Sequence, residues 1–134
     1  MNISVDYESI KDSIVYSFEE YVEEDGFSAP QAAAKTFEEE WRRLNYSMFT
    51  KTAYYICTAI ECFKLKKIPD FIYDKLEMYI NCTDFEEDTN KEDIEKLLEG
   101  IRECKELMEH KDYEIIELSY GAKSRIEYIL SLKS

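Results

Sequence analysis

Apolar residues recur every three or four positions along most of the chain, a spacing that places side chains on one face of an α-helix. The pattern predicts one helix that ends at Gly26, a second that begins at Ser28, a third that opens at Ser47, a fourth that follows Pro69, a fifth that begins at Thr89, and a last one over Tyr113–Leu132. The residues of the predicted core are Ile14, Phe18, Phe37, Trp41, Ile56, Ile60, Leu76, Ile80, Leu98, Ile101, Ile126 and Leu130.

Residues that begin and end helices lie between these segments. Gly26 is suited to the left-handed position that follows a helix. Ser28 and Gln31 have the spacing of a capping box, in which each side chain binds a backbone amide near the start of a helix, and Thr89 and Glu92 repeat that spacing. The residues that begin and end helices therefore lie at the boundaries that the apolar spacing predicts.

The segment Tyr113–Tyr120 is the one place where a strand competes with a helix. It is rich in residues that favour strands. A single strand would have no obvious partner in this sequence, so we expect helix here. Taken together, the patterns predict an all-α protein in which residues 1–134 form a single domain, a compact bundle of five or six helices.

Charge adds a functional hint to this fold. The chain has 30 acidic and 17 basic residues, which gives a formal net charge of −13. The acids concentrate in residues 1–45 and 70–100, whereas residues 46–69 are net basic. Such a chain repels phosphate backbones, which argues against nucleic acid as a direct ligand, and it attracts a basic protein partner.

The side chains needed for most catalysis are scarce. The sequence has one histidine and no glycine-rich phosphate-binding loop. Its four cysteines have no spacing that is typical of zinc sites, so we expect reduced thiols, no metal and no cofactor. The first residues do not resemble a signal peptide and no apolar run is long enough to span a membrane, so we expect a cytoplasmic protein without membrane contact.

Two acidic stretches are candidate partner-binding sites. The first stretch is predicted to be a loop in which an aromatic residue stands among four carboxylates, and it contains Asp84, Phe85, Glu86, Glu87 and Asp88. These carboxylates repel one another unless a basic partner neutralises them, and Phe85 would then serve as an apolar anchor. The alternative is a solvated connector between two helices.

The second acidic stretch ends the first predicted helix and contains Glu19, Glu20, Glu23 and Glu24. Acids at this end of a helix oppose the helix dipole, which suggests that they serve a purpose other than helix stability. An ordinary solvated surface is the alternative explanation.

Glu20 and Glu23 also form an E-x-x-E pair, with which the magnesium sites of helical nucleotide pyrophosphatases begin. Those enzymes need an E-x-x-D pair on a later helix. Glu109 and Asp112 have that spacing, but they come late and at a predicted helix end. The sequence therefore favours an enzyme less than a binding protein.

Eleven tyrosines are many for a chain of this length. Tyrosine is common at protein interfaces because it adds a large contact area at a small cost in entropy. Exposed tyrosines beside acids suit a partner rich in arginine and lysine. The tyrosines that fall outside the predicted apolar faces are Tyr16, Tyr46, Tyr54, Tyr73 and Tyr128.

The run from Phe18 to Ala33, followed by Phe37 to Trp41, has the form of a helix ending in acids and Asp-Gly, then a capped helix with alanines. This part of the chain resembles the small, acidic, all-helical immunity proteins of bacterial polymorphic and contact-dependent toxin systems. The resemblance covers about the first 80 residues and implies a protein that binds and blocks a toxin domain, often a basic nuclease. It implies no catalytic residues.

The leading hypothesis is therefore a non-enzymatic immunity protein that neutralises a cognate, basic toxin domain. Two alternatives remain open. One is a magnesium-dependent nucleotide pyrophosphatase that uses Glu20 and Glu23, and the other is an acidic adaptor or regulator of a basic nucleic-acid-binding protein.

Overall fold

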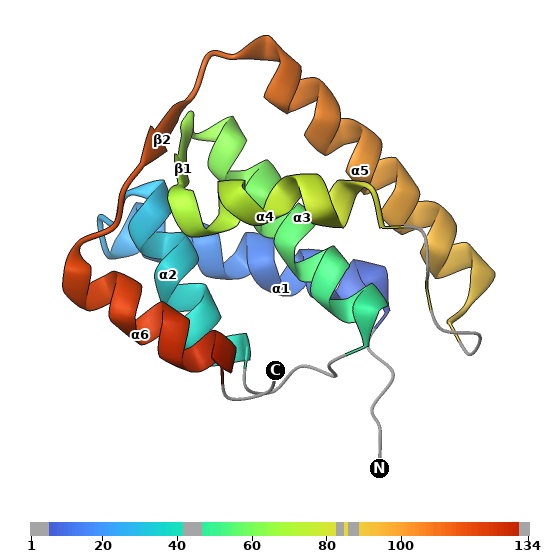
Figure 1. The fold of residues 1–134 in the computed structure, drawn as a ribbon, viewed down its shortest axis with the longest axis horizontal. Helices are drawn as coiled ribbons and strands as arrows, with labels where there is room; N and C mark the ends of the chain where they lie inside the picture. Colours follow the sequence, from blue (N-terminus) through green and yellow to red (C-terminus); the bar gives the residue numbers. More distant parts are fainter. Residues whose placement is uncertain (1–5, 42–46, 83–84, 86–88, 132–134) are drawn as a thin grey trace.

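The computed structural model describes residues 6–41, 47–82, 85 and 89–131. Within these ranges the chain forms six α-helices, one π-helical turn and two short strands, which confirms the all-α prediction (Figure 1). In chain order the elements are α1 (Tyr7–Glu19), η1 (Glu20–Glu24), α2 (Ala29–Glu40), α3 (Met48–Lys64), β1 (Lys67–Pro69), α4 (Asp70–Ile80), α5 (Lys91–His110), β2 (Glu114–Ile116) and α6 (Tyr120–Ser131).

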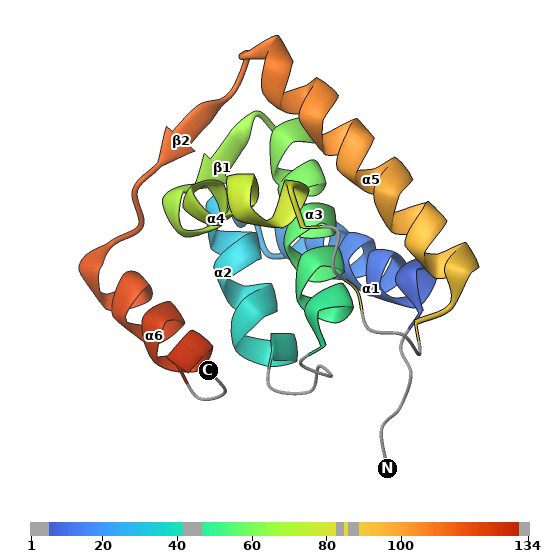
Figure 2. The ribbon, with the colours of Figure 1, turned by 45° about the vertical axis from the view of Figure 1, so that its right-hand side comes forward.

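Helix α3 is the centre of the bundle. It packs against α1, α4 and α5, and every residue from Thr52 to Ile60 is buried. A helix that is apolar on all sides belongs in a core, because no face of it is left for solvent. Figure 2 shows α3 enclosed by these neighbours, with α5 along one margin and α6 along the opposite one.

An aromatic cluster joins α2 to α3 and α4. Phe37 of α2 has no exposed surface, and its ring centroid lies 4.7 Å from that of Tyr54 and 5.2 Å from that of Tyr55. Both contacts have the edge-to-face geometry that aromatic pairs favour. Trp41, directly after α2, contacts Tyr54 at 5.6 Å and Tyr55 at 5.7 Å, so ring contacts fix the C-terminal end of α2 to α3.

Most of the predicted core is confirmed. Nine of the residues named from periodicity are buried, and Ile80 and Leu130 are half-buried at the core margin. Leu98 was predicted wrongly, since its side chain is 40% exposed. The inward position of α5 is taken by Leu97, which is fully buried, and a neighbouring residue lies about 100° further round a helix.

The predicted helix starts are also largely confirmed. Ser28 accepts from the Gln31 amide and Gln31 accepts from the Ser28 amide, so the capping box is complete. Gly26 has a φ of +71°, as its position after a helix requires. The start of α5 was predicted one residue too early, because Asn90 caps it by accepting from the Glu92 amide at 2.7 Å.

The expectation of helix over Tyr113–Tyr120 was wrong. Glu114–Ile116 form strand β2, which pairs in parallel with β1. The partner escaped sequence analysis because β1 is only three residues long and directly follows the end of α3. A residue with positive φ precedes each strand, Lys66 after α3 and Lys111 after α5. The Glu114 amide at the start of β2 donates to the Lys66 carbonyl at 2.9 Å.

Candidate acidic binding site

The structure groups the acids that end the first helix into one exposed surface. Glu19, Glu20, Glu23 and Glu24 surround a shallow hollow of about 180 Å³ together with Tyr16, whose side chain is 68% exposed. We call these five residues the acidic ridge. Sequence analysis predicted the four carboxylates as a partner-binding site and named Tyr16 separately as a residue outside the apolar face, and the fold places them side by side.

The backbone beneath this surface departs from a regular α-helix. Residues Glu20–Glu24 form a π-helical turn, in which the Asp25 amide donates to the Glu20 carbonyl at 3.2 Å. Such turns add a residue to a helix, and they occur frequently at functional sites. The turn ends at Gly26, so the chain reverses directly after the ridge.

The inner side of η1 is fixed to α2. The ring of Tyr21 stacks on Phe27 at 5.6 Å, and its hydroxyl donates to the carboxylate of Glu39. These contacts hold the backbone of the turn in place while its outer side faces solvent. The ridge is therefore presented by an anchored element, which lowers the entropic cost of binding a partner.

Negative charge dominates the surroundings of the ridge. None of its four carboxylates forms a salt bridge with another residue that the structure describes. The pKa of the Tyr21 hydroxyl is raised by burial, then by its hydrogen bond to Glu39, and further by the charges of Glu20 and Glu40. The field at the end of α1 therefore opposes further negative charge and favours cations.

The same face of α1 extends the ridge with two acids that sequence analysis missed. Glu8 and Asp12 are exposed and precede Tyr16 at intervals of four residues, so they follow one line along the helix. Glu8 is partly neutralised by Lys96, whose Nζ lies 3.2 Å from its Oε1. The signal was present in the sequence as a polar counterpart to the buried face of Ile10, Ile14 and Phe18.

The second predicted site is only partly described. Asp84, Glu86, Glu87 and Asp88 lie outside the residues that the structure describes. Phe85 is half-buried, and its ring centroid lies 6.0 Å from that of Phe49 in α3. Phe85 thus packs within the chain itself, and a contact between its ring and a partner stays a prediction.

Glu20 and Glu23 of the enzyme alternative lie beside Glu19 and Glu24, but among the described residues they form no group that could hold a metal ion. Asp112 lies 3.1 Å from the Nζ of Lys66, and this lysine lowers the pKa of the carboxyl group. In the described part of the chain no three His, Cys, Asp or Glu side chains are arranged to hold a metal ion. Burial raises the pKa of the Cys57 and Cys104 thiols to about 12, so neither is an active nucleophile near neutral pH.

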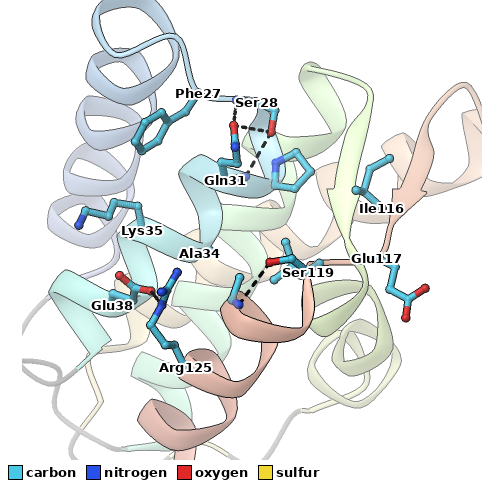
Figure 3. Close-up of a pocket in the computed structure, with 13 residues that line it drawn as sticks. Phe27, Ser28, Gln31, Ala34, Lys35, Glu38, Ile116, Glu117, Ser119 and Arg125 are labelled. Carbon is cyan, nitrogen blue, oxygen red and sulfur yellow. Dashed lines mark hydrogen bonds and ion pairs between the residues drawn. The ribbon is translucent and has the colours of Figure 1, made fainter.

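A larger hollow of about 710 Å³ separates α2 from the start of α6 (Figure 3). Several of its polar side chains are engaged with one another or with the backbone. Ser28 and Gln31 form the capping box of α2, Ser119 caps α6, and the Nε of Arg125 lies 3.0 Å from the Oε1 of Glu38. The hollow therefore holds structural contacts, and these contacts include no nucleophile with an adjacent base.

Comparisons with models of known protein families, with curated proteins and with solved structures find no match to this chain. Across the described ranges, no helix combines the length and the apolar character that crossing a bilayer requires. The charge and geometry of the acidic ridge indicate what this site can bind. It offers an anchored, exposed group of carboxylates around an aromatic ring, which is an arrangement suited to binding cationic side chains.

Proposed function

We propose that this chain is a non-enzymatic immunity protein that binds a basic bacterial toxin domain and neutralises it by direct contact. The acidic ridge carries the proposal, because its four exposed carboxylates have no salt-bridge partners among the described residues. Clustered like charges at the negative end of a helix are unfavourable in the free protein and become favourable against a cationic surface.

The chemistry of the contact follows from the ridge residues. Arginine and lysine side chains of the toxin would donate charge-assisted hydrogen bonds to the carboxylates. The exposed ring of Tyr16 would accept a cation–π contact worth roughly 0.5–2 kcal/mol. Asp84, Glu86, Glu87 and Asp88 are proposed as a second part of the same contact, since they offer the same charge.

The net charge of −13 supports rapid capture of such a toxin. Opposite charges raise association rates by about 10-fold to 1,000-fold at low ionic strength. Speed matters to a cell that makes the toxin itself, and complexes of nuclease toxins with their immunity proteins are among the tightest known.

The test requires that a gene adjacent to that of this chain encodes a large protein, and it uses the C-terminal domain of that protein. That domain is expressed in bacteria alone and together with this chain, and growth and binding of the purified pair are measured. We expect the domain to arrest growth, the chain to restore it, and the two proteins to form a one-to-one complex. Continued toxicity in the presence of excess chain would contradict the proposal.

The same proteins distinguish the two alternatives. A pyrophosphatase would hydrolyse a nucleotide in a magnesium-dependent reaction that Glu23→Ala abolishes. An adaptor would bind a basic nucleic-acid-binding protein without protecting cells from the toxin domain. We expect neither result.

A further inference from the structure

We propose that helix α6 detaches from the bundle and unfolds as one cooperative unit, beginning at the connecting residues 117–119, while the rest of the protein stays folded. The proposal concerns the free chain and does not depend on the acidic ridge. It rests on how α6 is attached, which differs from the attachment of every other α-helix that the structure describes.

Helix α6 has few partners. It packs mainly against α2, and Figures 1 and 2 both show it at the margin of the molecule beside that helix. Only Ile126 and Ile129 of its 12 residues are buried. Helix α3, by comparison, buries 13 of its 17 residues.

The contact between α6 and the bundle is incompletely packed. An open hollow of about 710 Å³ is lined by residues 116–119, Ala122 and Arg125 on one side and by residues of α2 on the other. Figure 3 shows Ser119 and Arg125 on the α6 side of this hollow. An open hollow of this size leaves part of the facing surfaces of α6 and α2 in contact with solvent instead of with each other. The apolar attachment of α6 therefore consists mainly of Ile126 and Ile129, with Leu130 half-buried beside them.

The polar contacts of α6 add little. Arg125 pairs with Glu38, but the arginine side chain is 68% exposed, and the Nζ of Lys123 lies 3.9 Å from the Oδ2 of Asp70. Exposed ion pairs contribute little to stability. The Oδ1 of Asp70 is buried and has no hydrogen-bond partner among the described residues, and such an oxygen is better satisfied by water.

The hinge lies after β2 and not before it. Tyr113 is fixed to the bundle by its ring, 4.7 Å from that of Phe63, and β2 is paired with β1. Residues 117–119 have no regular structure, and residues 117 and 119 are exposed. A helix of 12 residues is marginal in water once it loses its packing surface, so α6 should unfold when it leaves α2.

Hydrogen exchange of the purified chain, followed by mass spectrometry, tests the proposal. We expect the amides of α6 to exchange at least about 100-fold faster than those of residues 52–60 in α3, because local opening needs less free energy than global unfolding. Ile126→Ala should accelerate exchange in α6 by a further factor of about 10 or more and leave α3 unchanged. The matched variant Ile72→Ala, at a fully buried position of α4, should accelerate exchange throughout the bundle.

Exchange rates of the wild-type protein alone can contradict the proposal, so the test does not depend on whether a variant folds. Equal exchange rates in α6 and α3 would show that both open only in global unfolding. Acceleration of every helix by Ile126→Ala would show the same.

Discussion

Helix α3 and the acidic ridge show two different uses of a helix surface in one small protein. Residues 52–60 of α3 are all buried, and α3 packs against four other helices, α1, α2, α4 and α5. The five residues of the ridge are all exposed, and its four carboxylates form no salt bridge with the described residues. The first region provides the stability of the fold, and the second adds charge that the fold does not need.

Helix α1 joins the two regions, because its inner face packs on α3 and its outer face leads into the ridge. A change on the inner face should therefore alter stability, and a change on the outer face should alter binding alone. This separation can be tested by substitutions of decreasing expected effect.

The largest effect is expected in the aromatic cluster. Phe37→Ala removes a fully buried ring that contacts Trp41, Tyr54, Tyr55 and Phe71, and it should cost about 3–5 kcal/mol in the free energy of unfolding. Urea denaturation measures this loss.

Tyr16→Ala is the matched control, because it removes an exposed aromatic ring from the ridge. It should change the free energy of unfolding by less than about 0.5 kcal/mol. Similar losses for the two variants would contradict the division between the regions.

A smaller effect is expected where α5 meets α1. A Cβ atom at Gly100 would overlap the hydroxyl oxygen of Tyr7, whose side chain is buried. Gly100→Ala should therefore destabilise the protein by about 1–3 kcal/mol through overpacking.

The double variant Gly100→Ala with Tyr7→Phe sharpens this prediction, because it removes the overlapping oxygen. We expect it to be more stable than the sum of the two single changes, by a coupling of about 1 kcal/mol in a double-mutant cycle. Strict additivity would mean that the glycine matters for another reason.

A still smaller stability loss is expected at the start of α2. Ser28→Ala removes the side-chain acceptor of the capping box and should lower the free energy of unfolding by about 1 kcal/mol. Ser28→Asp retains an acceptor at the same position and should keep most of the stability. A thermal midpoint that is unchanged in Ser28→Ala would argue against the cap.

Much of this fold could be predicted because local signals and burial agree. Three features depend only on residues that are close together in the sequence. They are the capping box of Ser28 and Gln31, the helix end at Gly26 and the helical spacing of the core residues. Strands β1 and β2 could not be predicted, because the pairing of Lys67 with Glu114 joins segments 47 residues apart and neither strand is long enough to show a pattern.

The candidate site also contains features that the sequence analysis predicted and features that it missed. The four acids of the ridge could be named from the sequence because they oppose the helix dipole. Their grouping around Tyr16 follows from spacings of three, four, seven and eight residues, which lie on one face of a helix, although the tyrosine was named separately. Tyr54 shows the opposite case. It lies outside the predicted apolar face, yet it is buried because its hydroxyl donates to the Thr36 carbonyl at 2.9 Å.

The central claim is that the ridge binds a basic toxin domain, and a pair of variants with equal charge tests it most directly. One variant changes the ridge carboxylates Glu19, Glu20, Glu23 and Glu24 to glutamine. The control makes the same change at four exposed acids of α5, which are Glu95, Glu103, Glu106 and Glu109. Both variants gain four units of charge, and neither should lose stability.

The decisive measurement is the affinity of each variant for the toxin domain at low and at high salt. We expect the ridge variant to bind at least about 100-fold more weakly at both salt concentrations, mainly through faster dissociation, because it loses direct contacts. The α5 variant should bind within about 5-fold of the wild-type protein and differ mainly in its association rate at low salt. Equal affinities for the two variants would contradict the assignment of the ridge as the binding site.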